Sequence, residues 1–118
     1  MSVIAENVAR IRERMAEAAV QAGRDPAEIA LCAATKMNDA QAVQEAVRAG
    51  VDCCGENRVQ ELLQKLPLGA YTGVPVHFIG HLQTNKVKNV VGAVSLIESV
   101  DRPELLQAID RQAAKLGI

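Results

Sequence analysis

Four short apolar runs alternate with helix-like segments along this chain, and this alternation restricts the fold more than any other feature. The runs cover residues 29–35, 51–54, 76–79 and 93–98. Each is followed by a segment whose apolar residues recur at helical spacing, and no hairpin turn joins two runs. Strands that alternate with helices form a parallel sheet with right-handed crossovers, so we expect an α/β fold.

The expected helices have recognisable starts and ends. A leading helix precedes the first run, Asn38 and Asp39 can cap the helix that ends at Gly50, and Asp101 with Glu104 forms a possible capping box for the last helix. Apolar residues at helical spacing support five helices: Ile4 to Ala18, Ala42 to Val47, Val59 to Leu66, Val87 to Val91, and Leu105 to Leu116.

Two parallel architectures fit this pattern: an open doubly wound sheet, or βα units of a (β/α)₈ barrel. The first run is not followed by a Gly-x-Gly-x-x-Gly segment, which weighs mildly against a dinucleotide-binding fold. Polar residues follow the strands at their carboxyl ends, where both architectures place their active sites. Lys36 follows the first strand, Asn57 the second and His81 the third.

Lys36 closes the apolar run 29–35, which we interpret as a buried strand that delivers an amine to its carboxyl end. Lysine is rarely buried without a partner, and a desolvated amine loses its proton more readily and can attack carbonyl carbons. From position alone, a solvated lysine just past a strand is the more frequent case. The position of Lys36 alone therefore does not decide whether it forms a Schiff base, and the neighbouring motifs are needed to decide this.

Composition excludes several classes of function. The chain has 118 residues, 49% of them hydrophobic, and a net charge of −1, which gives no electrostatic basis for binding nucleic acid or a membrane surface. Tyr71 and Phe78 are the only aromatic residues, so a platform for stacking bases is absent. Neither a signal peptide nor a membrane span is evident, and we expect a cytoplasmic protein of one domain.

The cysteines and histidines do not indicate a metal site. The chain has an odd number of cysteines, namely Cys32, Cys53 and Cys54. We interpret them as reduced, small apolar core residues. His77 and His81 are four residues apart, but one lies inside a strand and the other beyond Gly80, so they need not share a face. We therefore expect no metal ligands.

Four segments in order carry a family resemblance: Leu-Cys-Ala-Ala-Thr-Lys at 31–36, Gly-Glu-Asn-Arg-Val-Gln-Glu-Leu at 55–62, His-Phe-Ile-Gly-His-Leu-Gln-Thr-Asn-Lys at 77–86, and Ile-Glu-Ser-Val-Asp-Arg at 97–102. Together they resemble the pyridoxal phosphate homeostasis protein family, also called the proline synthase co-transcribed family. The resemblance covers nearly the whole chain. Its second and third segments are specific, whereas the lysine strand alone would be a weak signal.

The resemblance implies a barrel like the N-terminal domain of alanine racemase, in which Lys36 holds pyridoxal 5′-phosphate as a Schiff base. It also implies a role in intracellular homeostasis of that cofactor, without established turnover and thus without catalytic residues. Asn57 and His81 are candidates for lining the cofactor pocket, and Glu56 is more readily a structural partner than an acid. The alternative is a racemase-like enzyme, which needs a second acid or base, yet Tyr71 lies in a loop.

The length of the chain restricts how much of a barrel it can form. A complete (β/α)₈ barrel takes roughly 250 residues, or about 31 per unit, and this chain has four units. We expect residues 1–118 to form the N-terminal half of an alanine racemase-like barrel domain. The resemblance places the phosphate ligands in the other half and implies a monomeric full-length protein. We therefore expect weak or absent cofactor binding, and a half that self-associates or pairs with a complementary chain.

Overall fold

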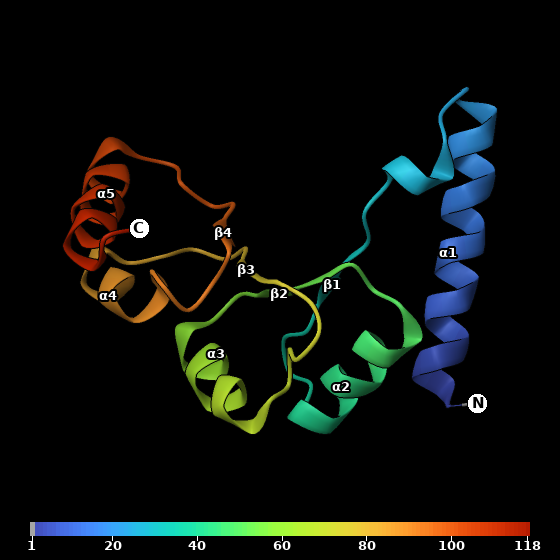
Figure 1. Cartoon of the computed structure of the whole chain (residues 1–118), viewed down its shortest axis with the longest axis horizontal. Helices are drawn as coiled ribbons and strands as arrows, with labels where there is room; N and C mark the ends of the chain where they lie inside the picture. Colours follow the sequence, from blue (N-terminus) through green and yellow to red (C-terminus); the bar gives the residue numbers. More distant parts are fainter. Residues whose placement is uncertain (1) are drawn as a thin grey trace.

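A computed structural model describes residues 2–118 and contains one four-stranded parallel sheet (Figure 1). Its strands are β1 Cys32–Ala34, β2 Cys53–Glu56, β3 Val76–Phe78 and β4 Leu96–Ile97, arranged in the order β1-β2-β3-β4. All three strand pairs are parallel. Because sequential strands are spatial neighbours, each crossover returns the chain to the adjacent position, as in a (β/α) barrel and not as in a doubly wound sheet.

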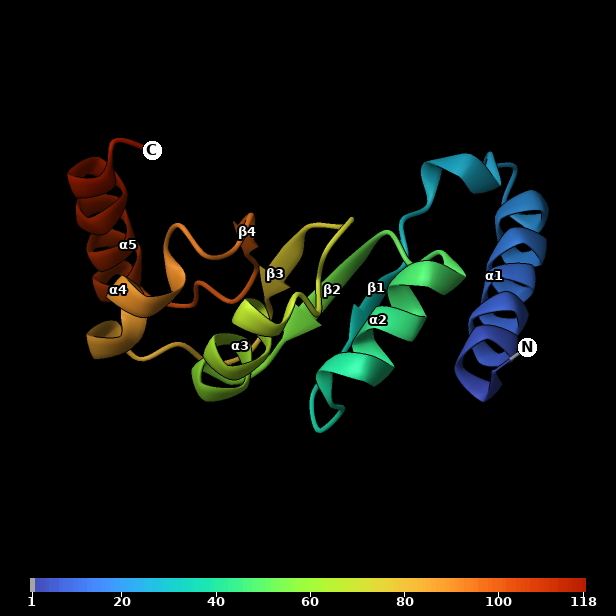
Figure 2. The same ribbon diagram turned by 60° about the horizontal axis from the view of Figure 1, so that its bottom comes forward.

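Five α-helices connect or flank these strands: α1 Val3–Gln21, α2 Ala40–Ala49, α3 Val59–Lys65, α4 Val87–Val90 and α5 Pro103–Leu116. Three short 3₁₀ turns, η1 Pro26–Glu28, η2 Leu66–Leu68 and η3 Thr84–Lys86, lie between them. Helix α1 packs beside α2, which lies next to β1 in both views (Figure 2). Within residues 2–118, no helix combines the length and apolar character that crossing a membrane requires.

Three strands are shorter than the corresponding apolar runs, and the remaining one, β2, is displaced. The first run contributes only 32–34 to a ladder, the last only 96–97, and the second strand lies at 53–56, not at 51–54. β2 extends to Glu56 because Cys54, Gly55 and Glu56 pair with Val76, His77 and Phe78 of β3. Just before β2, the carboxylate of Asp52 accepts the Leu31 N–H at 2.6 Å and an Arg12 N–H at 2.8 Å.

The predicted helix caps are confirmed at some helix ends and wrong at others. Asp39 caps α2 by accepting the Ala42 N–H at 2.8 Å, and Gly50 ends that helix in the left-handed conformation. The proposed capping box at α5 does not form. Arg102 occupies the N-cap position without a side-chain cap, and Asp101 instead binds the Arg102 guanidinium at 2.6 Å.

The two faces of the sheet have different surroundings. The helix-covered face carries the core, which includes the fully buried residues Cys54, Phe78, Leu62, Leu82 and Leu105. The opposite face, here called the inner face, carries the alternate strand residues Cys32, Ala34, Cys53, Gly55, His77 and Leu96. Cys32 and Ala34 are exposed and Leu96 is 50% exposed, so much of this face is open.

The molecule is an open, curved half of a barrel. In Figure 1, α1 and α5 stand at opposite ends, the sheet lies between them, and α2 and α3 cover one side of it. The radius of gyration is 15.8 Å, against about 13.5 Å for a compact domain of this length. The outer edges of β1 and β4 have no neighbouring strand in the described sheet. The predicted fold class, a leading helix followed by four βα units of a barrel, is thus confirmed.

Candidate functional site

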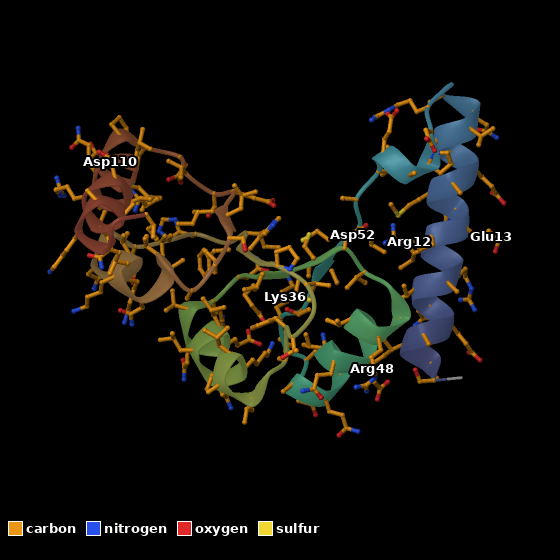
Figure 3. All side chains as sticks on the ribbon, viewed as in Figure 1. Arg12, Glu13, Lys36, Arg48, Asp52 and Asp110 are labelled. Carbon is orange, nitrogen blue, oxygen red and sulfur yellow. The ribbon has the colours of Figure 1, made fainter. Side chains whose placement is uncertain are left out.

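Lys36 lies just beyond the carboxyl end of β1, and its side chain is exposed. Strand alternation puts it on the same side as Cys32 and Ala34, the open inner face. The expectation of a wholly buried strand is wrong for this face, because nothing in the described chain covers it. Figure 3 shows Lys36 near the middle of the molecule, between Arg12 on α1 and Asp110 on α5.

A tight turn fixes the backbone around Lys36. The Asn38 N–H donates to the Thr35 carbonyl at 3.2 Å, and the Asn38 side-chain amide donates to the Lys36 carbonyl at 3.0 Å. Met37 has a φ of 63°, a left-handed conformation that costs a non-glycine residue on the order of 1 kcal/mol. The Met37 N–H donates to Glu61 at 2.8 Å, so helix α3 helps to hold this strained turn.

A buried polar network lies behind this turn and is centred on Glu56, the last residue of β2. Glu56 is completely buried, and its Oε2 accepts hydrogen bonds from Thr35 Oγ1 at 2.8 Å, Lys65 Nζ at 3.0 Å and Tyr71 OH at 2.5 Å. Burial and the Glu56 carboxylate both raise the pKa of Tyr71, so its hydroxyl keeps its proton. These contacts support the interpretation of Glu56 as a structural partner.

Lys65 connects the network to two further groups. Its Nζ donates to the Thr35 carbonyl at 2.8 Å and to Glu61 Oε1 at 3.1 Å, and the side chain is only 6% exposed. The Met37 N–H is the main cause that lowers the pKa of Glu61, and Lys65 adds to it. Strands β1 and β2 and helix α3 are therefore tied together beneath Lys36.

Asn57 stands at the carboxyl end of β2, two residues past Gly55, just as Lys36 stands two residues past Ala34, the register partner of Gly55. Arg58, not Asn57, occupies the N-cap position of α3, so the Asn57 side chain does not cap this helix. The buried Oδ1 of Asn57 has no hydrogen-bond partner among residues 2–118. A buried polar atom left unpaired in this way is costly, and a bound ligand can relieve that cost.

A cavity of about 510 Å³ lies between α3 and α4. Asn57 and His81 both line it, so the structure brings these two predicted residues together. Lys36 is not part of its lining. Two cations, Arg58 and Lys86, also line this cavity and make it a favourable place for an anionic group.

The segment that carries His81 is braced from α5. Arg102 donates to the Leu82 carbonyl at 2.7 Å while its other terminal nitrogen binds Asp101. On the other side, Gly80 lies directly against Asn57, and a Cβ on Gly80 would stand 2.3 Å from the Asn57 carbonyl oxygen. Only glycine lets the backbone after β3 approach the backbone after β2 so closely.

The inner face also holds a group that sequence spacing did not indicate. Cys32, Cys53 and His77 place one ligand atom each within 4.8 Å of one another, and His77 Nδ1 lies 2.7 Å from Glu98 Oε1. Cys53 and Cys54 are buried as expected, but Cys32 is exposed, so the core interpretation is wrong for it. The signal was cross-strand register, since Cys32 and Cys53 are direct partners in parallel strands.

Comparison with known proteins shows which proteins this chain is related to. The chain is 43% identical over 112 residues to the pyridoxal phosphate homeostasis protein of Pseudomonas aeruginosa, covering 95% of this chain and 49% of that protein. It is 40% identical over 113 residues to the protein of the same name from Aquifex aeolicus, of which it covers 50%. This chain matches the N-terminal half of the pyridoxal phosphate homeostasis protein family. The resemblance seen in the sequence is confirmed, although no family model matches the chain.

Solved structures agree with this assignment. A protein of unknown function from Bifidobacterium adolescentis superposes with a TM-score of 0.88 at 38% identity, over 98% of this chain and 51% of that one. PipY of Synechococcus elongatus, solved with pyridoxal phosphate bound, gives a TM-score of 0.80 at 35% identity, over 97% of this chain and 50% of PipY. The chain thus spans about half the length of the relatives that it matches.

Proposed function

We propose that this chain binds pyridoxal 5′-phosphate through a Schiff base to Lys36 and contributes to homeostasis of that cofactor. The cofactor, when bound, supplies an aldehyde carbon that a lysine amine attacks with loss of water. The observation that carries the proposal is the position of Lys36 on a braced strand end, in a fold shared with PipY, whose structure contains the cofactor. On this proposal, residues 1–118 are the first half of the barrel domain.

The residues present fit such a ligand. Lys36 is exposed on the open inner face, so an incoming aldehyde can reach its amine, while the turn at Thr35–Asn38 restricts where the side chain starts. The unpaired, buried Oδ1 of Asn57 offers an acceptor on the neighbouring strand end. His81 and Asn57 share one cavity wall, which supports a role for both in lining the cofactor pocket.

Each residue has a limited role in this proposal. Lys36 holds the ligand, Asn57 orients it by a hydrogen bond, and His81 borders it. None of them is assigned catalysis, because a carrier has to retain and release its ligand without transforming it.

No structural observation favours the alternative of a racemase. Racemisation needs a second acid or base on the face opposite the lysine. The one tyrosine of the chain, Tyr71, is buried and donates its hydroxyl hydrogen to Glu56 on the helix-covered side of the sheet. It is therefore unsuited to that task.

A titration of the chain with pyridoxal phosphate, followed by the absorbance and fluorescence of the bound cofactor, tests the proposal. We expect saturable binding that is lost in Lys36→Arg, because an arginine keeps the charge but forms no imine at neutral pH. Lys115→Arg, on the exposed surface of α5, serves as the matched control and should bind normally. Equal cofactor binding by the Lys36→Arg variant would refute the proposal. If the wild-type chain converts L- or D-alanine and the Lys36→Arg variant does not, the racemase alternative would be favoured.

We also propose that this half of a barrel associates with a second chain, either its own copy or a complementary half. The unpaired edges of β1 and β4 and the exposed inner-face residue Leu96 support this, because open strand edges promote pairing. Sedimentation velocity over a range of concentrations tests the proposal. A sedimentation coefficient that rises with concentration is expected, and a compact monomer at all concentrations would contradict association with its own copy.

A further inference from the structure

The group formed by Cys32, Cys53 and His77 has no part in the proposed cofactor site. The three side chains come from β1, β2 and β3, three adjacent strands, and all of them project from the inner face. One ligand atom from each lies within 4.8 Å of the others. In a zinc site, sulfur and nitrogen atoms lie about 2.0–2.3 Å from the metal, so a small contraction of this group would bring all three into contact with one ion.

We propose that Cys32, Cys53 and His77 form a zinc-binding site on the inner face of the sheet. Two thiolates and one imidazole are the donor set that Zn²⁺ favours, and three protein ligands leave the fourth tetrahedral position for water or an added ligand. The ligands stand on neighbouring strands, whose ladder hydrogen bonds fix their separation, which makes the site more rigid than one built on a loop.

Glu98 has a defined part in this site. Its Oε1 lies 2.7 Å from His77 Nδ1, so that nitrogen is occupied and Nε2 is the one free to bind a metal. A carboxylate that accepts the second N–H of a ligating histidine fixes the tautomer and the orientation of the ring. The pairing therefore makes Glu98 a positioning residue rather than a ligand.

The site is separate from Lys36. Cys32 and Lys36 are four residues apart on one extended segment, which corresponds to about 13 Å along the chain. Zinc at Cys32 and a ligand at Lys36 can therefore be tested independently, and a failure of one proposal leaves the other standing.

The first experiment uses the unmodified chain, reduced and free of metal, titrated with Co²⁺ as a spectroscopic substitute for Zn²⁺. We expect one ion per chain, a thiolate-to-metal charge-transfer band in the near ultraviolet, and the intense visible bands of a tetrahedral site. Added Zn²⁺ should displace the Co²⁺ and bleach these bands. A spectrum without the charge-transfer band would overturn the proposal without reference to any variant.

The second experiment measures Zn²⁺ affinity by competition with a chromophoric chelator. Cys32→Ser, Cys53→Ser and His77→Gln should each lose most of the affinity, and Glu98→Gln should lose about 10- to 100-fold, the range for partners of a ligating histidine. Cys54→Ala is the matched control, because Cys54 adjoins Cys53 but faces the helix-covered core. It should bind one zinc with wild-type affinity, and so should Lys36→Ala.

Circular dichroism of each variant confirms that it retains helix and sheet. Loss of zinc in Cys54→Ala together with retention in folded Cys32→Ser would overturn the assignment of ligands. Wild-type affinity in folded Cys53→Ser or His77→Gln would overturn it as well.

Discussion

Lys65 Nζ on α3 lies 2.8 Å from the carbonyl oxygen of Thr35 at the end of β1, so a buried cation holds the strand end that presents Lys36. The same Nζ is 3.0 Å from Glu56, which binds the Thr35 hydroxyl. The position of the lysine proposed to bind the cofactor thus depends on a second, buried lysine. Damage to this network should affect stability first and cofactor binding as a consequence.

Glu56→Gln should lower the free energy of unfolding by about 3 kcal/mol. The substitution removes one charge of a buried pair and leaves Lys65 with Glu61 as its only carboxylate partner. Urea unfolding followed by circular dichroism measures the change. Glu61→Gln is the control, since this side chain is 19% exposed and should lose only about 1 kcal/mol. Equal losses in the two variants would show that burial of Glu56 does not set the strength of the network.

Gly80→Ala should destabilise the chain more than Gly55→Ala. A Cβ on Gly80 meets backbone atoms of Asn57 at 2.3 and 2.7 Å, and backbone cannot rotate away. A Cβ on Gly55 meets the side chain of Ile79 at 2.7 Å, which can adopt another rotamer. We expect a loss of about 3 kcal/mol at Gly80 and about 1 kcal/mol at Gly55, from the range for overpacking. Thermal unfolding of both variants checks the order, and the reverse order would contradict the described approach of the two strand ends.

Asp52→Asn should make the stability less dependent on pH in the acid range. The Leu31 N–H, and then Arg12, hold the pKa of Asp52 below its ordinary value of 3.8. A carboxyl whose pKa is lower in the folded state contributes stability above its unfolded pKa and loses it as the pH falls through the folded pKa. The wild type should therefore exceed the variant by about 0.5–1 kcal/mol at pH 7, an amount typical of an exposed pair, and by less below pH 4.

Unfolding curves measured from pH 7 down to pH 3.5 test this expectation. Glu13→Gln provides the control, because Glu13 lies on the exposed side of α1, away from the rest of the chain (Figure 3). It should unfold like the wild type at each pH. A difference between wild type and Asp52→Asn that grows as the pH falls would contradict the assigned direction.

The fold could be predicted from the sequence because its signals are local. Apolar runs, helical stripes and the cap at Asp39 each depend on residues close together in the chain, and they fixed the order of strands and helices. The bounds of the strands were less predictable because they depend on which residues pair across neighbouring strands. Gly55 and Glu56 pair with His77 and Phe78 of β3, which no local pattern reveals, and this pairing extends β2 to Glu56.

The candidate site was predictable only in part. The position of Lys36, Asn57 and His81 at strand ends follows from the βα order, whereas the buried network on Glu56 does not. Lys65 and Tyr71 join that network from α3 and the following loop, so their roles appear only when the chain is folded. The inner-face group of Cys32, Cys53 and His77 likewise depends on register, which a spacing rule along one segment cannot detect.

Reduction of the cofactor complex with borohydride tests the central proposal most directly. The chain is incubated with pyridoxal phosphate, reduced, digested and mapped by mass spectrometry, which locates any lysine that has become covalently attached. The proposal predicts that the label lies on Lys36 and that Lys36→Ala yields little labelled peptide. Labelling spread equally over the exposed lysines Lys86, Lys88 and Lys115, or absent from Lys36, would contradict it.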